Sequence, residues 1–508
     1  MKITGSTARR QSPPRDRVDH WVILFLCVVA GLRVLIYCAA FPFFNNVDEV
    51  AHFDLVVKYS HGQPPNGFER LSPETAQYVA RYATPEYLSH AEPSGSEHVP
   101  PPPWARGSRE TSADLARKTA AWQRATNPES SQGPLYYALA GSWMDLGRAC
   151  IPAGGVLLYW IRFFNVPVIV ALVLLGHFAA RMIFPESRFM RLGVPALLAF
   201  FPQDAFYSIQ NDVLSPVCFG VAFIGLVRLF RDKHLTMPAG LVIGLAIAAT
   251  GFVKVSNLPL LVVAVAAILL KAWQVAEANK FRTAFPALAV LALSAGLPLA
   301  GLAVWNELRF GDATGSAGKI ALLGWTRKPF LYWWEHPIFS PAGLWTFLHD
   351  LIASFWRGEI VWFGRRLALK PVDYSYSISS GIVLAMGAAC VFPKPARTSV
   401  FQPSILWLPI ACCFASVSYL AALSTVFDFG ACLYPSRAYP YFASGRLSSG
   451  IMIPFAVLYV LGIDRLFGSA KSDLPKWLAL GGVILIAVIS EMIVIWPIFS
   501  SEYNLFHI

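Results

Sequence analysis

The sequence predicts an all-α polytopic membrane protein with about eleven transmembrane helices. Of its 508 residues, 56% are hydrophobic and only 14% are charged, whereas about 25% of the residues in soluble domains are charged. The apolar residues fall into long blocks, and a helix of about 20 apolar residues crosses the hydrocarbon core of a bilayer. Lys and Arg collect in short loops between alternate blocks, which is typical of cytoplasmic loops.

The first apolar block, Trp21–Phe41, follows a basic N-terminal tail. It is longer than the hydrophobic part of a signal peptide and no small-residue cleavage site follows it, so we interpret it as a signal anchor spanning 21–42. The other predicted spans lie near residues 160–182, 190–209, 211–230, 238–253, 255–271, 284–306, 376–393, 403–424, 448–467 and 477–499.

With a cytoplasmic N-terminus, every basic loop falls on the cytoplasmic side, as the positive-inside rule requires. These loops contain Arg181/Arg188/Arg191, Arg228/Arg231/Lys233, Lys271/Lys280/Arg282, Lys394/Arg397 and Arg465/Lys471/Lys476. Membrane topology thus explains most of the net charge of +11. No basic helix with interleaved aromatic residues is present, so the sequence argues against a nucleic-acid partner.

The segment Pro134–Cys150 must not cross the membrane, because crossing would move every later basic loop to the other side. It contains Asp145 and Arg148, and we interpret it as a helix lying in the outer interface. The chain then divides into a cytoplasmic tail (1–20), a transmembrane module (21–306) with an extracytoplasmic loop (43–159), a second extracytoplasmic loop (307–375) and C-terminal transmembrane helices (376–508).

The two large outer loops differ in charge. Residues 42–132 carry eleven acids and eight bases, whereas residues 307–373 carry eight bases and six acids. We therefore expect the loops to complement each other electrostatically around a substrate with an anionic part.

The polar stretch NNVDEVAHFD, Asn45–Asp54, directly follows the first span. In a helix that begins near Asn46, Asp48 and His52 lie on one face. This geometry suits a general base with an orienting partner, or two ligands of a divalent metal ion, and Glu49 is an alternative base. A solvated first helical turn, where acids are favoured, is the simpler alternative.

Further polar residues interrupt apolar sequence at the predicted outer ends of the spans. Asn211 and Asp212 lie in a tight turn, where they can cap the next helix or contribute to a site. Lys254 can extend to the surface or bind an anion. Arg162 breaks the positive-inside pattern, which points to a specific anionic partner such as a phosphate.

A first span followed at once by a loop bearing Asp-Glu resembles the GT-C glycosyltransferases, membrane enzymes that use polyprenyl-phosphate-linked sugars. More closely, a series of motifs along the chain resembles the signature stretches of a bacterial family of polytopic membrane proteins, related to protein O-mannosyltransferases and lipid A aminoarabinose transferases. In order, these motifs are NNVDEVAHFDLVVKYSHGQPP, SQGPLYY, YSIQNDVL, WNELRFGDATG, SFWRGEIVWFG and ASGRLSSGIMIPF. The chain departs from the usual HPPLYY or EPPLYY with SQGPLYY, and Arg446 is followed by Leu447 instead of the more common Tyr.

The resemblance implies a GT-C-like fold in the bacterial inner membrane, with an active site on the extracytoplasmic face. The donor would be a polyprenyl-phosphate sugar, and the acceptor a glycan, lipid or protein hydroxyl. Asp48 or Glu49 would be the base, and a divalent metal ion bound by Asp48 and His52 remains an alternative. The other predicted site residues are Arg162, Lys254 and Arg446 as ligands of the donor phosphate and His52, Asn211 and Asp212 as supporting polar groups.

The main alternative is a transporter or flippase for an anionic lipid-linked glycan. A transporter is expected to carry ionisable residues near the midplane of several helices. The predicted spans near 284–306 and 477–499 are almost free of them, with Glu491 as the main exception. A homologue without activity that scaffolds an envelope assembly is a third possibility.

Overall fold

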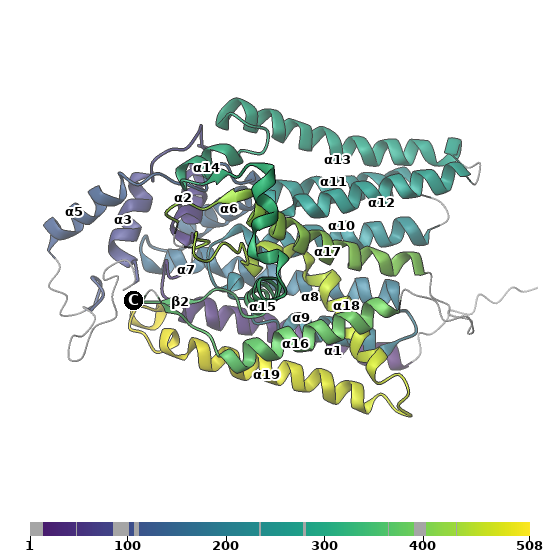
Figure 1. The fold of residues 1–508 in the computed structure, drawn as a ribbon. Coiled ribbons are helices and arrows are strands. Elements are labelled where there is room, and N and C mark those ends of the chain that lie inside the picture. Colours follow the sequence, from purple (N-terminus) through teal and green to yellow (C-terminus); the bar gives the residue numbers. More distant parts are fainter. Residues whose placement is uncertain are drawn as a thin grey trace, which may run out of the picture.

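A computed structural model of the protein describes residues 14–46, 48–84, 101–105, 111–232, 235–277, 281–363, 365–390, 403–432 and 434–508. Long helices run side by side and form one bundle (Figure 1). The helices of this bundle are α1 (Pro14–Ala40), α7 (Gly155–Phe163) continuing into α8 (Asn165–Ile183), α9 (Arg188–Ala199), α10 (Ser215–Arg231), α11 (Met237–Val253), α12 (Leu258–Glu277), α13 (Phe281–Phe310), α16 (Lys370–Ala389), α17 (Pro403–Val426), α18 (Met452–Leu466) and α19 (Leu474–Phe499).

Shorter elements gather at one end of the bundle, which we call the loop-rich end (Figure 1). Its α-helices are α2 (Glu49–Ser60), α3 (Pro73–Tyr82), α5 (Ser112–Trp122), α6 (Pro134–Cys150), α14 (Ser316–Leu322) and α15 (Pro341–Arg357). The 3-10 helices are η1 (Asp204–Tyr207), η2 (Asn211–Leu214), η3 (Val255–Asn257), η4 (Phe330–Glu335), η5 (Pro337–Phe339), η6 (Gly445–Ile451) and η7 (Leu505–His507). Two antiparallel pairs of short strands join β1 (Thr326–Arg327) to β4 (Phe427–Asp428) and β2 (Val361–Trp362) to β3 (Arg365–Arg366).

The structure confirms the all-α polytopic class. Among the described residues, eight helical segments are long and apolar enough to cross a membrane. They are Val18–Ala40, Gly155–Ile183, Asn211–Arg231, Val255–Glu277, Arg282–Phe310, Ile405–Val426, Gly445–Leu466 and Leu474–Phe499. The other three predicted spans correspond to α9, α11 and α16, which are shorter or less apolar.

The predicted span near 190–209 is helical only in its first half. Helix α9 ends at Ala199, and Pro202 follows in an extended segment that leads into η1. A proline disfavours the helical conformation of the residue before it, which explains the early end. With 12 residues, α9 is about 18 Å long, which is less than the thickness of the hydrocarbon core. The segment after Ala199 instead contributes polar groups to the loop-rich end.

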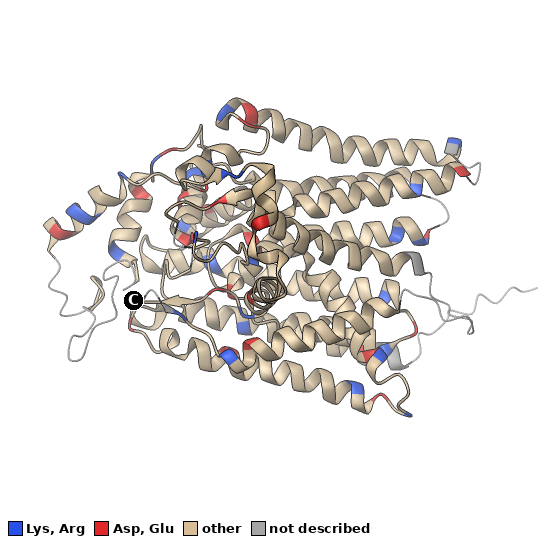
Figure 2. Cartoon of the chain, in the orientation of Figure 1, with Lys and Arg blue, Asp and Glu red and all other residues tan. Residues whose placement is uncertain are grey.

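Charged residues concentrate at the two ends of the bundle (Figure 2). At the end opposite the loop-rich end, Asp19 of α1 binds Arg188 and Arg191 of α9. At the same end, Arg231 donates to the carbonyl of Met182. Where the structure describes them, the bases of the other predicted loops share this end of the bundle; Lys233, Lys280 and both bases of the Lys394/Arg397 loop lie outside the described residues.

Helix α18 lies at the centre of the bundle and packs against α8, α9, α16 and α17. In its candidate span, 89% of the residues are buried, and a helix that is apolar on all sides fits such a position. Gly462 allows α16 to approach closely, because a Cβ atom there would lie 1.9 Å from the carbonyl oxygen of Val383.

Helix α6 has the bounds predicted for the non-crossing segment and packs against α2 and α7 at the loop-rich end (Figure 1). It is not one of the candidate membrane spans. A second small core ties the 338–351 region to α17 and the segment before η6. Its buried members are Ile338, Phe347, Leu351, Leu420, Tyr441 and Ala443.

Replacing Gly462 by Ala should destabilise the bundle, because the added methyl group overlaps the Val383 carbonyl of α16. Overpacking of this kind costs about 1–3 kcal/mol. Gly481→Ala is the matched control, since a Cβ at position 481 of α19 meets no atom within 4 Å. Thermal unfolding in detergent should show a lower Tm for Gly462→Ala only. Equal Tm values for the two variants would contradict this packing.

Candidate active site

The centre of the candidate site is an ion pair between Asp48 and Arg446. Asp48 immediately precedes α2, and its backbone has a φ of 67°, a conformation that Asp tolerates better than most residues. Its carboxylate makes no capping hydrogen bond to the helix. Instead, Oδ2 accepts a hydrogen bond of 2.6 Å from Arg446 of η6, and 31% of the Asp48 side chain stays exposed. A helix-preceding carboxylate is thus directed away from its own helix and toward a cation.

Arg446 lies between three carboxylates from distant parts of the chain. Besides Asp48, it lies 3.8 Å from Asp212 and 3.5 Å from Glu359. Asp212 is fully buried and binds Nζ of Lys254 through both oxygens, at 2.8 and 2.9 Å. The structure therefore brings together four of the predicted site residues, Asp48, Asp212, Lys254 and Arg446.

Opposite charges set the protonation state of Asp48. Burial by itself raises the pKa of its carboxyl, but the positive charges of Arg446 and Lys319 outweigh burial and hold the pKa well below its usual range. Asp48 is therefore a carboxylate at neutral pH, with little affinity for a proton as long as Arg446 stays bound.

Glu49 is held in a different environment, where it forms a buried ion pair with Arg162. Each of these side chains is about 1% exposed. The Arg162 guanidinium donates to both Glu49 oxygens, at 2.9 and 2.8 Å, and to the carbonyls of Cys38, Phe41 and Pro42. All five N–H groups of Arg162 are thus engaged. This geometry leaves none for a lipid phosphate, the partner expected for Arg162 from the sequence.

The remaining hydrogen-bonding capacity of Glu49 goes to the backbone. Its carboxylate accepts from the N–H groups of Phe44 and Ile209, at 2.8 and 2.9 Å. The Glu49–Arg162 pair thus joins the end of α1, the start of α2, α7 and the segment after η1.

His52 lies in α2 and is hydrogen bonded to Tyr137 of α6, with 2.7 Å between Nδ1 and the phenolic oxygen. It does not contact the Asp48 carboxylate through its ring; only its backbone N–H reaches Asp48, at the carbonyl oxygen. Burial lowers the pKa of His52 to about 4, so the ring is neutral at neutral pH. His52 therefore helps to join α2 to α6.

A divalent metal ion held by Asp48 and His52 stays a prediction, and the geometry does not favour it. Arg446 occupies one carboxylate oxygen of Asp48, and Tyr137 occupies Nδ1 of His52. Within the part of the chain that the structure describes, no group of three or more His, Cys, Asp or Glu side chains is arranged to hold a metal ion.

Asn211 links the site to the first loop. Its side-chain nitrogen donates to Gln132 and to the carbonyl of Val253, at 3.1 and 3.0 Å. Its side-chain oxygen is buried and accepts no hydrogen bond from the described residues. Neither Asn211 nor Asp212 caps the helix that follows, and both are used in tertiary contacts.

The sequence did not single out several other charged residues at this end. Glu359 accepts from Ser444 and Arg366, and Lys319 of α14 binds Glu129 of the first loop. The Lys319–Glu129 pair joins the basic second loop to the acidic first loop. The opposite charge of the two loops was therefore the feature of the sequence that could have indicated this pair.

Asp204 is a further buried acid next to this cluster. One of its oxygens accepts from Asn46 and from the backbone N–H of Glu359, at 3.1 and 3.2 Å. Burial and the neighbouring Glu359 carboxylate raise the pKa of Asp204 to about 7. The sequence did not indicate Asp204 as a site residue, because it lies inside the stretch that was predicted to be a membrane span.

One position of the departure from the usual HPPLYY motif, Gly133, has a structural reason. A Cβ atom at Gly133 would lie 2.1 Å from the carbonyl oxygen of Phe252, at the end of α11. Only glycine fits this close approach of the start of α6 to α11.

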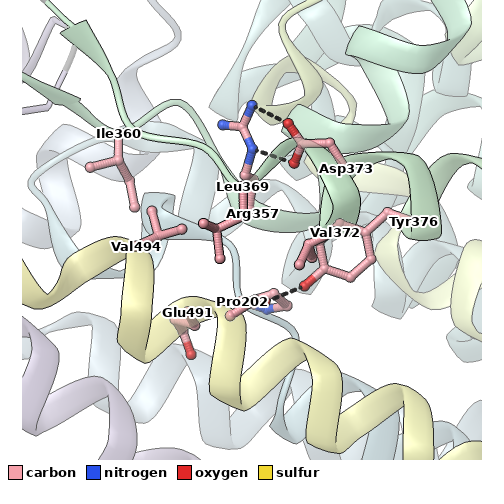
Figure 3. Close-up of a pocket in the computed structure, with 10 residues that line it drawn as sticks. Pro202, Arg357, Ile360, Leu369, Val372, Asp373, Tyr376, Glu491 and Val494 are labelled. Atoms are coloured by element: carbon pink, nitrogen blue, oxygen red, sulfur yellow. Dashed lines mark hydrogen bonds and ion pairs between the residues drawn. The ribbon is translucent and has the colours of Figure 1, made fainter.

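Two hollows lie away from the Asp48–Arg446 pair. A cavity of about 10 Å³, with room for about one water molecule, lies between α15, α16, α19 and Pro202, where Arg357 binds Asp373 (Figure 3). A larger groove of about 450 Å³ is lined by residues from 328–337 and 427–440. None of the predicted site residues lines either hollow.

Comparison with known families places the chain. The profile of a family described as "Predicted membrane protein (DUF2142)" matches residues 32–311, more than half of the sequence. The chain belongs to this family. The matched residues of this DUF2142 protein include Asp48, Arg162, Asp212 and Lys254, whereas Arg446 lies beyond them.

Known structures and curated sequences add little to the DUF2142 assignment. Among the solved structures that match is the archaeal oligosaccharyltransferase AglB from Archaeoglobus fulgidus, in complex with an inhibitory peptide and a dolichol-phosphate. The similarity has a TM-score of 0.44 and 12% identity, and it covers 96% of this chain but 56% of AglB. A similarity at this level supports no argument about activity. No curated protein matches the chain.

Removing one partner of the Glu49–Arg162 pair should destabilise the protein strongly, because it leaves the other charge buried without a counter-charge. We expect Arg162→Met to cost about 3–5 kcal/mol and the double variant Glu49→Leu/Arg162→Met to recover part of this loss. Arg437→Met, which removes a surface ion pair with Asp428, should leave the unfolding transition unchanged. Denaturant unfolding in detergent measures all three. If Arg162→Met unfolds like wild type, the pair does not stabilise the fold.

Proposed function

We propose that this protein is a membrane glycosyltransferase that moves a sugar from a polyprenyl-phosphate donor to an acceptor hydroxyl. The observation that carries the proposal is the Asp48–Arg446 pair: a partly exposed carboxylate beside a cation, directly after the first span. The resemblance of the sequence motifs to those of GT-C glycosyltransferases supplies the reaction.

Asp48 is the better candidate for the base. Both oxygens of Glu49 are saturated by four donors, and its side chain is 1% exposed, so an acceptor hydroxyl has no access to it. Among the residues that the structure describes, Asp48 has one strong partner, Arg446, and its side chain is 31% exposed. A base must lie within hydrogen-bond reach of the proton that it removes, so the more exposed Asp48 is the base that we propose.

Arg446 and Lys254 are the proposed ligands of the donor phosphate. They lie together, and each is bound to a carboxylate that a phosphate can replace. Cations at this place would stabilise the negative charge that develops on the leaving phosphate oxygen. Asn211 is fully buried, so we propose it as a supporting group that holds Gln132 and the end of α11 beside these cations.

Donor binding would also activate the base. As long as Arg446 binds Asp48, the pKa of the carboxyl is too low for efficient proton transfer. A phosphate that draws Arg446 away removes the largest of the charges that lower the pKa of Asp48, so this pKa rises. The base would thus gain affinity for a proton only once the donor is in place.

The proposed reaction is a direct displacement. The acceptor oxygen attacks the anomeric carbon, the bond from that carbon to the phosphate oxygen breaks, and the hydroxyl proton passes to Asp48. Polyprenyl phosphate leaves, and the anomeric configuration is inverted. We place the loop-rich end on the extracytoplasmic face, because the opposite end carries the basic short loops.

The transporter alternative finds one supporting observation. Arg33 of α1 binds Glu491 of α19 at 2.9 Å, and both residues lie within candidate membrane spans. Ionisable residues inside a membrane often belong to transport pathways. Here Tyr207 donates a hydrogen bond to Glu491, and Arg33 donates one to the carbonyl of Phe201. These contacts fit a static link between helices equally well. Sided accumulation of a lipid-linked glycan in proteoliposomes, without chemical conversion, would favour transport.

Replacing Asp48 by Asn should abolish sugar transfer, because the amide cannot take the acceptor proton. General-base catalysis typically contributes about 10²–10⁴-fold to a rate. In a deletion strain, mass spectrometry of extracted lipids should reveal an accumulated polyprenyl-phosphate sugar. The wild-type gene should clear it, and Asp48→Asn should not.

Asp428→Asn is the control, since Asp428 lies at the same end but its carboxylate binds Arg437 and the backbone N–H of Gly430 and none of the proposed site residues. It should clear the lipid like wild type. Clearance by a correctly inserted Asp48→Asn variant would show that Asp48 is not the base. Absence of any accumulated lipid in the deletion strain would argue against the transferase itself.

A further inference from the structure

Large apolar side chains stay exposed between β1 and the first turns of α15. From Phe330 to Trp345 the sequence contains one acid, Glu335, and no Lys or Arg. A water-exposed segment of this length would carry about four charged residues at the usual composition. We call the exposed apolar members the aromatic ridge. They are Phe330, Leu331, Tyr332, Trp334, Phe339, Leu344 and Trp345.

Helix α15 lies across the direction of the bundle. In Figure 1 it is seen end-on, whereas the membrane-crossing helices run across the picture. A helix in this orientation lies parallel to the membrane plane. It buries Gly343, Phe347 and Leu351, one per helical turn, and presents Leu344 and Trp345 outward. An outward face that meets water normally carries charged residues, and this one does not.

Three stacked aromatic rings connect α15 to the first turns of α16. Trp345 stacks on His349 with 5.7 Å between ring centroids, and His349 stacks on Tyr374 at 4.6 Å. Tyr374 lies in the first turns of α16, and Ile378 and Ile382 continue from it at four-residue steps. All three are about half exposed, as expected for a helix face toward lipid. The ridge thus continues the apolar strip of α16.

We propose that the aromatic ridge and α15 lie in the lipid–water interface of the leaflet at the loop-rich end, with phospholipid as their partner. Trp and Tyr rings favour this depth, because one part of each ring is apolar and another can form hydrogen bonds. An interfacial helix needs an apolar face, an orientation in the membrane plane and a place at the end of a span. The segment has all three, and the inference does not depend on the proposed reaction.

Helix α5 of the first loop provides the contrast. None of its residues is buried, and its sequence includes Asp114, Arg117 and Lys118. Helix α5 thus has the charged composition expected of a helix that faces water, which the aromatic ridge lacks. Ala116 of α5 is exposed.

The test places a dansyl amino acid at one position of the full-length protein in phosphatidylcholine nanodiscs. The two test positions are Trp345 and Leu344, which keep the experiment informative if one variant does not fold. Ile382 of α16 is the lipid control, and Ala116 is the water control. Brominated phosphatidylcholines, with bromine near the headgroup or near the chain end, and aqueous iodide are the quenchers.

Dansyl at 344 and 345 should show blue-shifted emission and be quenched by brominated lipid, more strongly by bromine near the headgroup. Ile382 should respond more to bromine near the chain end, and Ala116 only to iodide. Quenching of 344 and 345 by iodide alone would overturn the proposal, since the ridge would then face water. Protection from both quenchers would also overturn it, because a second copy or another protein would then cover the ridge.

Discussion

The buried ion pair between Glu49 and Arg162 fixes the place where the chain leaves its first span. Arg162 binds the carbonyls at the end of α1, and Glu49 accepts from the backbone N–H groups of Phe44, before α2, and of Ile209, after η1. Two charges in a nearly dry environment are tolerated only because every donor and acceptor is used. The pair holds the start of α2, so the neighbouring Asp48 carboxylate faces Arg446 and not its own helix.

Charge balance then determines the rest of the site. Arg446 comes from a segment almost 400 residues beyond Asp48 in the chain, and its approach to Asp212 and Glu359 joins three parts of the molecule. Such a cluster is costly to bury, but its members can exchange partners with an incoming anion. Under the proposed function, a phosphate would replace the carboxylates that now bind the two cations, Arg446 and Lys254. The same ion pairs thus stabilise the loop-rich end and carry the chemistry that we propose for it.

The sequence allowed the membrane class, most spans and the non-crossing helix α6 to be predicted, because hydrophobic length and loop charge act locally. It also placed Asp48, Asp212 and Lys254 at one end. It could not distinguish Asp48 from Glu49, since that difference arises from Arg162, more than 100 residues away. It missed Glu359 for the same reason. The early end of α9 has a local signal, Pro202, but the apolar run up to residue 209 favoured a longer span.

The central claim is that Asp48 and a donor phosphate compete for Arg446. A cryo-EM structure of the protein in nanodiscs with bound polyprenyl phosphate tests this most directly. We predict that Arg446 and Lys254 contact the phosphate and that Arg446 leaves Asp48 Oδ2, to which it is now bound at 2.6 Å. A phosphate bound elsewhere, with the Asp48–Arg446 pair intact, would contradict the account.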